Sequence, residues 1–246
     1  MNLSDLQTTW NGLGGTDPLW AILSHPDKKG RRWNTEEFFA TGVREIESLM
    51  SDLRSRSRPL GTRAALDFGC GVGRLTQPLW KYFDEVVGVD LSATMVRIAE
   101  AHNRAPGRCR YLVNAAPSLA QFPTGSFDLV LSYLTLQHIP PLYSTSYLRE
   151  FVRVTRTGGT ICVQLPAAPT TRSAALRVSL SHARNTLWAV LGRVGIGGGA
   201  RAGMYGVSRE TVRDVLRDAG AQLEDVTPAD QDTPRWTGYH YVAIKG

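Results

Sequence analysis

Short apolar runs alternate with amphipathic stretches from residue 63 to the end of the chain. Runs rich in Val, Leu, Ile and Ala predict strands at 63–68, 85–89, 109–113, 127–131, 160–165, 221–226 and 239–244. Apolar positions at helical spacing predict helices at about 74–83, 92–102, 142–154 and 208–219. Strands that alternate with helices are typical of a parallel sheet covered on both faces, so the predicted fold class is α/β, doubly wound.

The first 60 residues carry a helical pattern only. Leu3, Leu6 and Trp10 recur every three or four positions, as on one face of a helix. The glycines that follow, at positions 12, 14 and 15, are expected to end this helix. The pattern therefore predicts helices rather than strands ahead of the sheet.

A longer helix is predicted between the N-terminal segment and the first strand. Asn34 or Thr35 is expected to cap it, because both residue types accept hydrogen bonds from unpaired helical N–H groups. Residues 51–59 are expected to be a basic linker. We therefore predict a helical N-terminal cap over residues 1–60 and a core domain over residues 61–246.

Residues 166–206 interrupt the alternation and are predicted to form a helical lid inserted in the core. Their apolar positions indicate one or two amphipathic helices, followed by a glycine hinge at 195–199. The segment holds no Asp or Glu and five arginines: Arg172, Arg177, Arg184, Arg193 and Arg201. It supplies most of the formal net charge of +6, so a broad nucleic-acid-binding surface is not indicated.

The composition, 42% hydrophobic and 20% charged, is that of a globular protein. No apolar run is long enough to cross a bilayer, and the N-terminus lacks a signal-peptide pattern, so we expect a cytoplasmic protein. The cysteines at 70, 109 and 162 form no C-x-x-C pair, and no His, Asp or Glu grouping has metal-ligand spacing. Neither a disulfide nor a metal site is expected.

Residues 66–76 read LDFGCGVGRLT, a strand that runs into a glycine-rich turn. Glycine lets a polar ligand approach the backbone, and a turn before a helix aims N–H groups at an anion. Arg74 breaks the dinucleotide fingerprint G-x-G-x-x-G at its sixth position. An ordinary tight turn is the alternative, but the stretch resembles motif I of class I S-adenosylmethionine (SAM)-dependent methyltransferases.

Two further positions agree with this resemblance. Asp90 ends the second strand, 21 residues after Gly69, where a carboxylate accepts from both hydroxyls of a ribose. This role serves NAD and SAM alike, and helix capping is the alternative. The family places adenine contacts at the end of the third strand, here Asn114 and Ala115, although a simple turn is equally open there.

The stretch GSFDLVLS at 125–132, continuing to Gln137 and His138, resembles motif IV and the loop that follows it in small-molecule methyltransferases. Methyltransferases of nucleic-acid amino groups carry Asn/Asp-Pro-Pro-Tyr/Phe at this point, and cytosine-C5 enzymes carry Pro-Cys. Neither pattern occurs in this chain. The departure argues against DNA bases as substrate.

The resemblance implies a seven-stranded sheet, mostly parallel with the last strand antiparallel, and SAM as cofactor with S-adenosylhomocysteine (SAH) as product. It implies a set of cofactor-binding residues in the core: Asp67, Gly69, Cys70, Gly71, Arg74, Asp90, Leu91, Asn114, Ala115, Ser132 and Gln137. In similar bacterial proteins the cap folds over the methionine end of SAM, which makes Trp33, Thr41 and Gly42 further candidates. Core packing is the alternative for these three, and Arg74 is expected to meet the methionine carboxylate.

Methyl transfer is an in-line displacement at a sulfonium, so the protein must align the acceptor and exclude water. An oxygen acceptor must also lose a proton. His138 is the first candidate base because it follows the fourth strand and titrates near neutrality, and Tyr133 is the second. Capping of the next helix and contact with the cofactor are the alternative roles of His138.

The lid is expected to bind the acceptor. Its candidate residues are Arg172, Arg177, Arg184 and Tyr205, since arginine binds carboxylate, phosphate or sulfate groups in a bidentate manner. A solvated basic face and contact with anionic lipid are the alternatives.

These features predict methyl transfer from SAM to O or N of a small molecule, anionic or similar to a sugar or natural product. The alternatives are an RNA or protein methyltransferase, a SAM-binding protein without turnover, and an NAD-dependent oxidoreductase. No nucleic-acid partner and no membrane span are expected. A monomer and a homodimer are both open.

Overall fold

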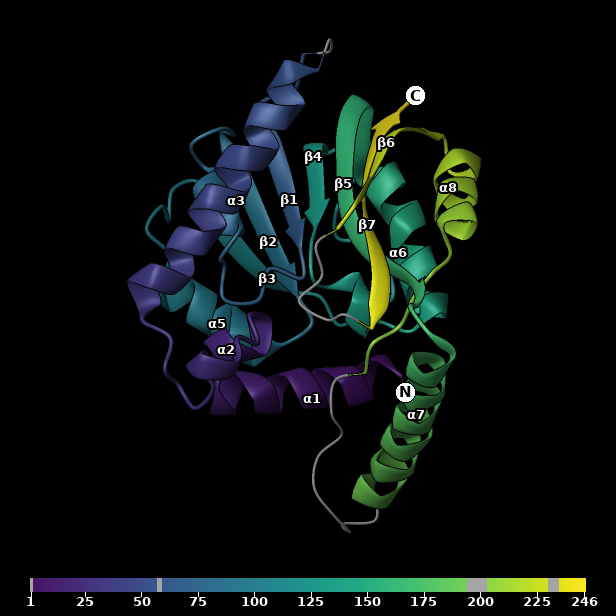
Figure 1. Cartoon of the computed structure of the whole chain (residues 1–246). Helices are drawn as coiled ribbons and strands as arrows, with labels where there is room; N and C mark the ends of the chain where they lie inside the picture. The colour runs from purple at the N-terminus through teal and green to yellow at the C-terminus, as the bar shows by residue number, and fades with distance from the viewer. Residues whose placement is uncertain (1, 57–58, 194–202, 230–234) are drawn as a thin grey trace.

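A seven-stranded sheet forms the centre of the computed structural model, with the strand order β3-β2-β1-β4-β5-β7-β6 (Figure 1). The structure describes residues 2–56, 59–193, 203–229 and 235–246. The strands are β1 (Ala64–Phe68), β2 (Glu85–Asp90), β3 (Cys109–Val113), β4 (Phe127–Ser132), β5 (Thr155–Pro169), β6 (Ala221–Pro228) and β7 (Trp236–Lys245). The predicted doubly wound α/β fold is confirmed.

The directions and order of the strands indicate at which edge of the sheet a ligand binds. β1 pairs in parallel with both β2 and β4, while β7 runs antiparallel to β5 and β6, as predicted for the last strand. The strand order reverses between β1 and β4, so the turn after β1 and the loop after β4 leave the sheet side by side. Open α/β sheets bind ligands at this kind of switch point.

Helices cover both faces of the sheet and one of its edges. They are α1 (Leu3–Thr16), α2 (Pro18–Ile22), α3 (Thr35–Ser55), α4 (Thr76–Leu79), α5 (Ala93–Ala101), α6 (Pro141–Val154), α7 (Arg172–Arg193) and α8 (Arg209–Asp218), with short 3-10 turns η1 (Pro26–Lys28) and η2 (Leu136–His138). α6 and α8 cover one face and α3 and α5 the other, while α1 lies across the carboxyl ends of the strands (Figure 1).

Side-chain caps begin the helices where the sequence predicts them. Asn34 Oδ1 accepts from the backbone N–H of Glu37 at 3.0 Å and starts α3. Ser92 and Ser208 cap α5 and α8 in the same way. These bonds satisfy N–H groups that have no partner within the helix, so the caps fix where each helix leaves the sheet edge.

The N-terminal helix does not stop at its glycines, so that prediction was wrong. α1 continues to Thr16, and the glycine at position 14 lies inside it. A Cβ added to Gly14 would stand 3.0 Å from Cγ2 of Thr94 in α5. Glycine therefore serves close packing of α1 on α5 here.

Two helix boundaries also differ from the predictions. The helix expected at 74–83 is reduced to the four residues of α4, because Pro78 has no N–H to donate and turns flank it. The linker expected at 51–59 is helical as far as Ser55, since Leu53 is buried in the core with the rest of the α3 face.

β5 is longer at both ends than the predicted strand. It begins at Thr155, directly after α6, and its pairing with β4 is irregular between Thr155 and Thr160. Gly158, with φ of +77°, allows that irregularity.

The predicted insertion contains a single described helix, α7, which extends away from the sheet (Figure 1). Leu176 and Leu180 on α7 are 62% and 61% exposed. The predicted glycine hinge at 195–199 lies outside the described residues.

Over the described part of the chain, no helix combines the length and apolar character that crossing a membrane requires. The division into a cap of residues 1–60 and a core of 61–246 stays a prediction.

α3 approaches the backbone of the glycine-rich turn at Gly42. A Cβ on Gly42 would stand 2.1 Å from the carbonyl oxygen of Arg74, a backbone atom that cannot swing aside. We predict that Gly42→Ala lowers the free energy of unfolding by about 1–3 kcal/mol or more, measured by urea denaturation. Gly12→Ala, in a helix with open space around the new methyl group, is the matched control and should raise it by about 0.5–1 kcal/mol. Equal effects of the two changes would contradict the close approach.

Candidate functional site

A cavity lies at the carboxyl edge of the sheet. It joins the turn after β1, the end of β2 and the loop after β4. The lining residues are Leu3, Leu6, Trp10, Ala21, Ile22, Asp67, Phe68, Gly69, Cys70, Gly71, Arg74, Leu75, Val89, Asp90, Leu91, Met95, Asn114, Tyr133, Leu134, Thr135, His138, Ile139 and Tyr147.

The glycine-rich turn has a backbone that requires glycine. Gly69, Gly71 and Gly73 all have positive φ, of 78°, 52° and 85°. A Cβ on Gly69 would stand 2.1 Å from Thr135 of the loop after β4, and one on Gly71 would stand 2.6 Å from Ile22 of α2. The turn is thus packed between these two neighbours, with no room for a larger residue.

Asp90 holds this turn against the end of β2. Its Oδ2 accepts from the N–H of Gly71 at 2.9 Å, and its Oδ1 accepts from the N–H of Ser92 at 2.8 Å. Burial raises the pKa of Asp90, and these backbone N–H groups oppose that rise. Each carboxylate oxygen retains further acceptor capacity, which matches the two hydroxyls of a ribose.

The other buried charges lie at the same end of the cavity. Asp67 is 2% exposed and accepts from Oγ1 of Thr76 at 2.6 Å. Burial raises the pKa of Asp67 to about 7. Arg74 is 3% exposed, and its Nη1 donates to Glu45 at 2.6 Å.

The guanidinium of Arg74 is only partly satisfied, because its buried Nε has no hydrogen-bond partner. A buried unpaired N–H costs free energy, and an anionic group in the cavity would relieve it. A ligand with a ribose and a carboxylate, such as SAM, therefore fits the donors and acceptors at this end.

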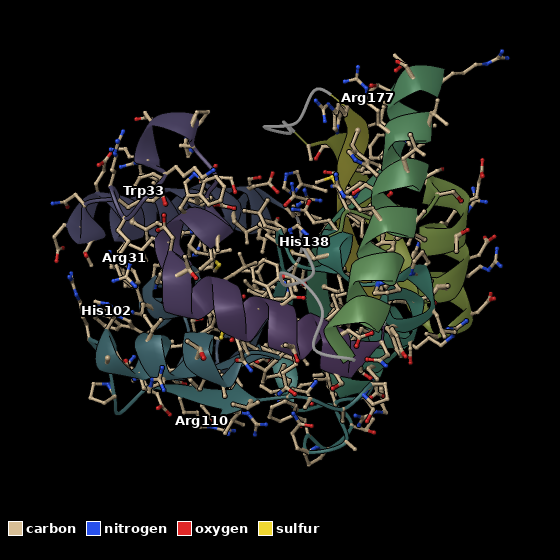
Figure 2. All side chains as sticks on the ribbon, turned by 90° about the horizontal axis from the view of Figure 1, so that it is seen from below. Arg31, Trp33, His102, Arg110, His138 and Arg177 are labelled. Carbon is tan, nitrogen blue, oxygen red and sulfur yellow. The ribbon has the colours of Figure 1, made fainter. Side chains whose placement is uncertain are left out.

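His138 lies beside α1 at the centre of this edge (Figure 2). Its Nδ1 is 2.9 Å from the carbonyl oxygen of Gly203, its Nε2 is 3.3 Å from Nε2 of Gln137, and its ring meets Trp10 edge-on at 5.1 Å. Burial lowers the pKa of His138, and the bond to Gly203 opposes that change. The ring is therefore neutral near pH 7, as a proton acceptor must be.

Tyr133, the second candidate base, also lines the cavity. Its ring packs edge-on against His240 of β7 at 4.8 Å. Burial raises the pKa of Tyr133 well above its ordinary value, so its hydroxyl stays protonated near pH 7. Tyr133 can donate a hydrogen bond there, but it is a poor base.

Some predicted cofactor residues in the core lie off the cavity or are already engaged. Ser132 Oγ donates to the carbonyl of Phe68 at 3.0 Å and ties β4 to β1. Ala115 is exposed, and Gln137 contacts His138 rather than the cavity. Asn114 lines the cavity, but its side chain bonds Ala116 and Gln121, so its contact with adenine stays a prediction.

The predicted cap contacts are displaced in the structure. Trp33 donates to the carbonyl of Leu23 and packs on Phe38, away from the cavity. Thr41 and Gly42 lie beside Arg74 rather than on the cavity wall. The cap reaches the cavity through α1 and α2 instead.

The lining residues that the sequence did not predict include five on these two helices: Leu3, Leu6, Trp10, Ala21 and Ile22. Their helical spacing is visible in the sequence, but it does not distinguish a cavity wall from core packing.

The insertion arginines lie apart from the cavity. Arg172, Arg177 and Arg184 are exposed on α7 and do not line it. Figure 2 places Arg177 at the α7 side of the molecule and Trp33 on the opposite side of His138. Tyr205 does not line the cavity either, but its N–H donates to the carbonyl of Gln137 at 2.7 Å. Binding of the acceptor by these four residues stays a prediction.

No group of three or more His, Cys, Asp or Glu side chains with a metal-binding arrangement occurs among the described residues. The three cysteines are buried free thiols.

Residues 66–163 match the family model described as a methyltransferase domain. Residues 66–163 of this chain are a methyltransferase domain. The match begins one residue before Asp67 and ends in β5, so it includes the glycine-rich turn, Asp90 and His138. The predicted family is thereby confirmed, while the roles of single residues stay predictions.

Curated relatives of this methyltransferase domain include ubiquinone biosynthesis O-methyltransferases. The protein from Ralstonia nicotianae is 32% identical over 130 residues, which are 52% of this chain and 53% of that protein. The protein from Methylococcus capsulatus is 36% identical over 103 residues, 42% and 43% of the two chains. The chain thus spans about half the length of the curated relatives it matches.

Solved methyltransferase structures share the fold. Magnesium protoporphyrin IX methyltransferase from Synechocystis PCC 6803, solved with bound SAH, gives a TM-score of 0.64 at 19% identity and covers 99% of both chains. A putative sarcosine dimethylglycine methyltransferase from Galdieria sulphuraria gives 0.60 at 14% identity, over 83% of this chain and 86% of that one. At such identities the likeness concerns the fold alone.

The buried carboxyl of Asp67 makes the stability of the methyltransferase domain depend on pH. Its pKa rises from 3.8 to about 7 on folding, so the folded state binds the proton more tightly. The tighter binding of this proton therefore adds its full amount to the free energy of unfolding below pH 3.8. That addition is lost as the pH rises to about 7. We predict that Asp67→Asn gains stability relative to the parent protein across this window, by roughly a few kcal/mol. Urea denaturation at a series of pH values, without cofactor, measures the difference, and a difference independent of pH would contradict the burial effect.

Proposed function

We propose that this chain transfers the methyl group of SAM to a hydroxyl oxygen of a small molecule. The observation that carries the proposal is that one cavity joins the glycine-rich turn and Asp90 to a neutral histidine. The names of the curated relatives support O-methylation, and the solved relative with bound SAH supports the cofactor.

The cofactor is held by the charged end of the cavity. The Asp90 carboxylate takes the ribose hydroxyls, and Arg74 takes the methionine carboxylate through its unpaired Nε–H. Leu91 and Met95 lie on the wall next to Asp90, where an apolar surface suits the adenine ring. When bound, SAM supplies an electrophilic methyl group on a sulfonium.

The remaining wall sets the chemistry of the acceptor. The charged side chains that line the cavity, Asp67, Arg74 and Asp90, are all committed to the cofactor end. The rest of the lining is mostly apolar or aromatic and includes Leu6, Trp10 and Ile139. Such a surface suits a neutral acceptor with an apolar body and a hydroxyl group, rather than the anionic acceptor that the arginine-rich insertion suggests.

His138 takes the hydroxyl proton. With Nδ1–H donated to the Gly203 carbonyl, Nε2 carries the lone pair, and the hydroxyl of the acceptor displaces the amide nitrogen of Gln137, 3.3 Å away, to reach it. Trp10 packs against the ring and excludes water from it. The chain therefore aligns the hydroxyl, removes its proton and keeps solvent out, which is what transfer to oxygen requires.

Arg74 is tested through the affinity for SAM. We predict that Arg74→Ala raises the Kd for SAM about 10- to 100-fold, because a charge-assisted bond to the carboxylate is lost. Glu45→Gln is the matched control, since it removes the ion-pair partner of Arg74 and leaves the guanidinium in place. It should leave the affinity unchanged or higher. Calorimetry gives the Kd for SAM of both variants. If both changes weaken SAM binding equally, Arg74 acts through its ion pair with Glu45 and not through a bond to SAM.

His138 is tested by turnover. We predict that His138→Gln lowers kcat about 10²- to 10⁴-fold with the Kd for SAM unchanged, since only proton removal is lost. SAH release is measured with a panel of small phenols and catechols, each paired with a carboxylate-bearing counterpart. The neutral member of each pair should react faster, and the acid limb of kcat should lie below the ordinary imidazole pKa of about 6.5.

His25→Gln, a change at an exposed histidine away from the cavity, is the control and should leave kcat unchanged. Full activity of His138→Gln would contradict the assigned base, and the absence of SAH release with every acceptor would contradict the proposed function.

A further inference from the structure

His138 is held by a segment that returns from the insertion. We call residues 203–205 the return segment. The Nδ1 atom of His138 lies 2.9 Å from the carbonyl oxygen of Gly203. A carbonyl oxygen only accepts, so Nδ1 carries a proton and donates it. In a neutral imidazole Nε2 is then the acceptor, and the amide nitrogen of Gln137 lies 3.3 Å from it.

Two contacts hold the return segment against the loop after β4 and against α7. The N–H of Tyr205 donates to the carbonyl of Gln137, the residue before His138, at 2.7 Å. On the α7 side, Nε2 of His182 lies 2.9 Å from the carbonyl oxygen of Met204. The rings of His182 and Tyr205 stack at 4.5 Å with an interplanar angle of 19°. The carbonyl of Gly203 is therefore placed by its neighbours on both sides.

We propose that the return segment fixes His138 as the tautomer that can act as a base, and that His182 and Tyr205 are positioning residues for it. This inference rests on the proposed role of His138 in proton removal. It gives the insertion a task that does not need its arginines: α7 is connected to the reacting end of the cavity through His182, the return segment and the His138 ring.

The tautomer decides whether His138 can accept a proton from a hydroxyl. If the Gly203 carbonyl moves away, Nδ1 loses its acceptor and the ring proton is free to move to Nε2. A ring with Nε2–H has no lone pair there, and its remaining lone pair lies on the side where Gly203 stood. A displaced α7 would therefore slow proton removal without changing the charged end of the cavity, where SAM binds.

The test reads the tautomer directly by ¹H–¹⁵N NMR of ¹⁵N-histidine-labelled protein, at a pH where the imidazoles are neutral. The loss of a signal in His138→Gln assigns the ring among the five histidines. We expect the Nδ1–H tautomer in the parent protein. In Tyr205→Ala and His182→Ala the signals should move toward the Nε2–H form, and kcat should fall about 10- to 100-fold with the Kd for SAM unchanged.

Two matched variants separate positioning from a general loss of structure. Tyr205→Phe keeps the aromatic ring and the backbone N–H, so it should keep the parent tautomer and kcat. Ser179→Ala changes an exposed α7 side chain off the cavity and should also leave both unchanged. An unchanged Kd for SAM in the alanine variants shows that the domain is folded.

The proposal is overturned if His138 carries Nε2–H in the parent protein, or if its tautomer is the same in the parent, Tyr205→Ala and His182→Ala. Failure of the proposed function gives a different result. A parent protein that does not bind SAM, or that releases no SAH, contradicts the proposed function while the tautomer measurements still decide the role of the return segment.

Discussion

The bond from the N–H of Gly71 to the Asp90 carboxylate is the contact on which the rest of the site depends. It joins a turn that only glycine can form to the end of the neighbouring strand, and so fixes where the backbone leaves β1. Two further bonds, from Gly69 and Cys70 to the carbonyl of Val89, hold the same turn. With the turn fixed, Ile22 and Thr135 can pack directly against its Cα atoms and close the cavity from both sides.

The cavity that results combines buried charged side chains with an apolar lining. Buried charges gather at the turn, where the carboxylates accept hydrogen bonds and Arg74 has an ion-pair partner, because an isolated charge could not be buried there. The rest of the lining comes mainly from α1 and the loop after β4, and it is mostly apolar and includes His138. Under the proposed function, the charged side chains hold the cofactor and the apolar lining receives the acceptor.

The sequence predicts what is determined locally. Strand positions, the left-handed turn and the acid at the end of β2 follow from short-range patterns, and the structure has them where predicted. Contacts between segments that are far apart in the sequence leave no such short-range pattern. The apolar face of α1 has the same spacing whether it packs on a core or on a cavity, so Trp10 could not be recognised as a wall of the site. Gly14 reads as a helix stop until the contact with Thr94 is seen.

The insertion is a second case, in which a pattern of charged residues does not show where their side chains lie. Five arginines without an acid favour an anion site in the sequence, but the direction of α7 turns Arg172, Arg177 and Arg184 to solvent. The positions of His182 and Tyr205 relative to His138 depend on how the chain returns to the sheet, which no local pattern specifies.

We propose that the glycine-rich turn and Asp90 hold SAM rather than a dinucleotide. Parallel calorimetric titrations of the parent protein with SAH and with NAD test it most directly. The structure predicts saturable binding of SAH at one site per chain and no measurable binding of NAD. Binding of NAD, or failure to bind SAH, would contradict the account.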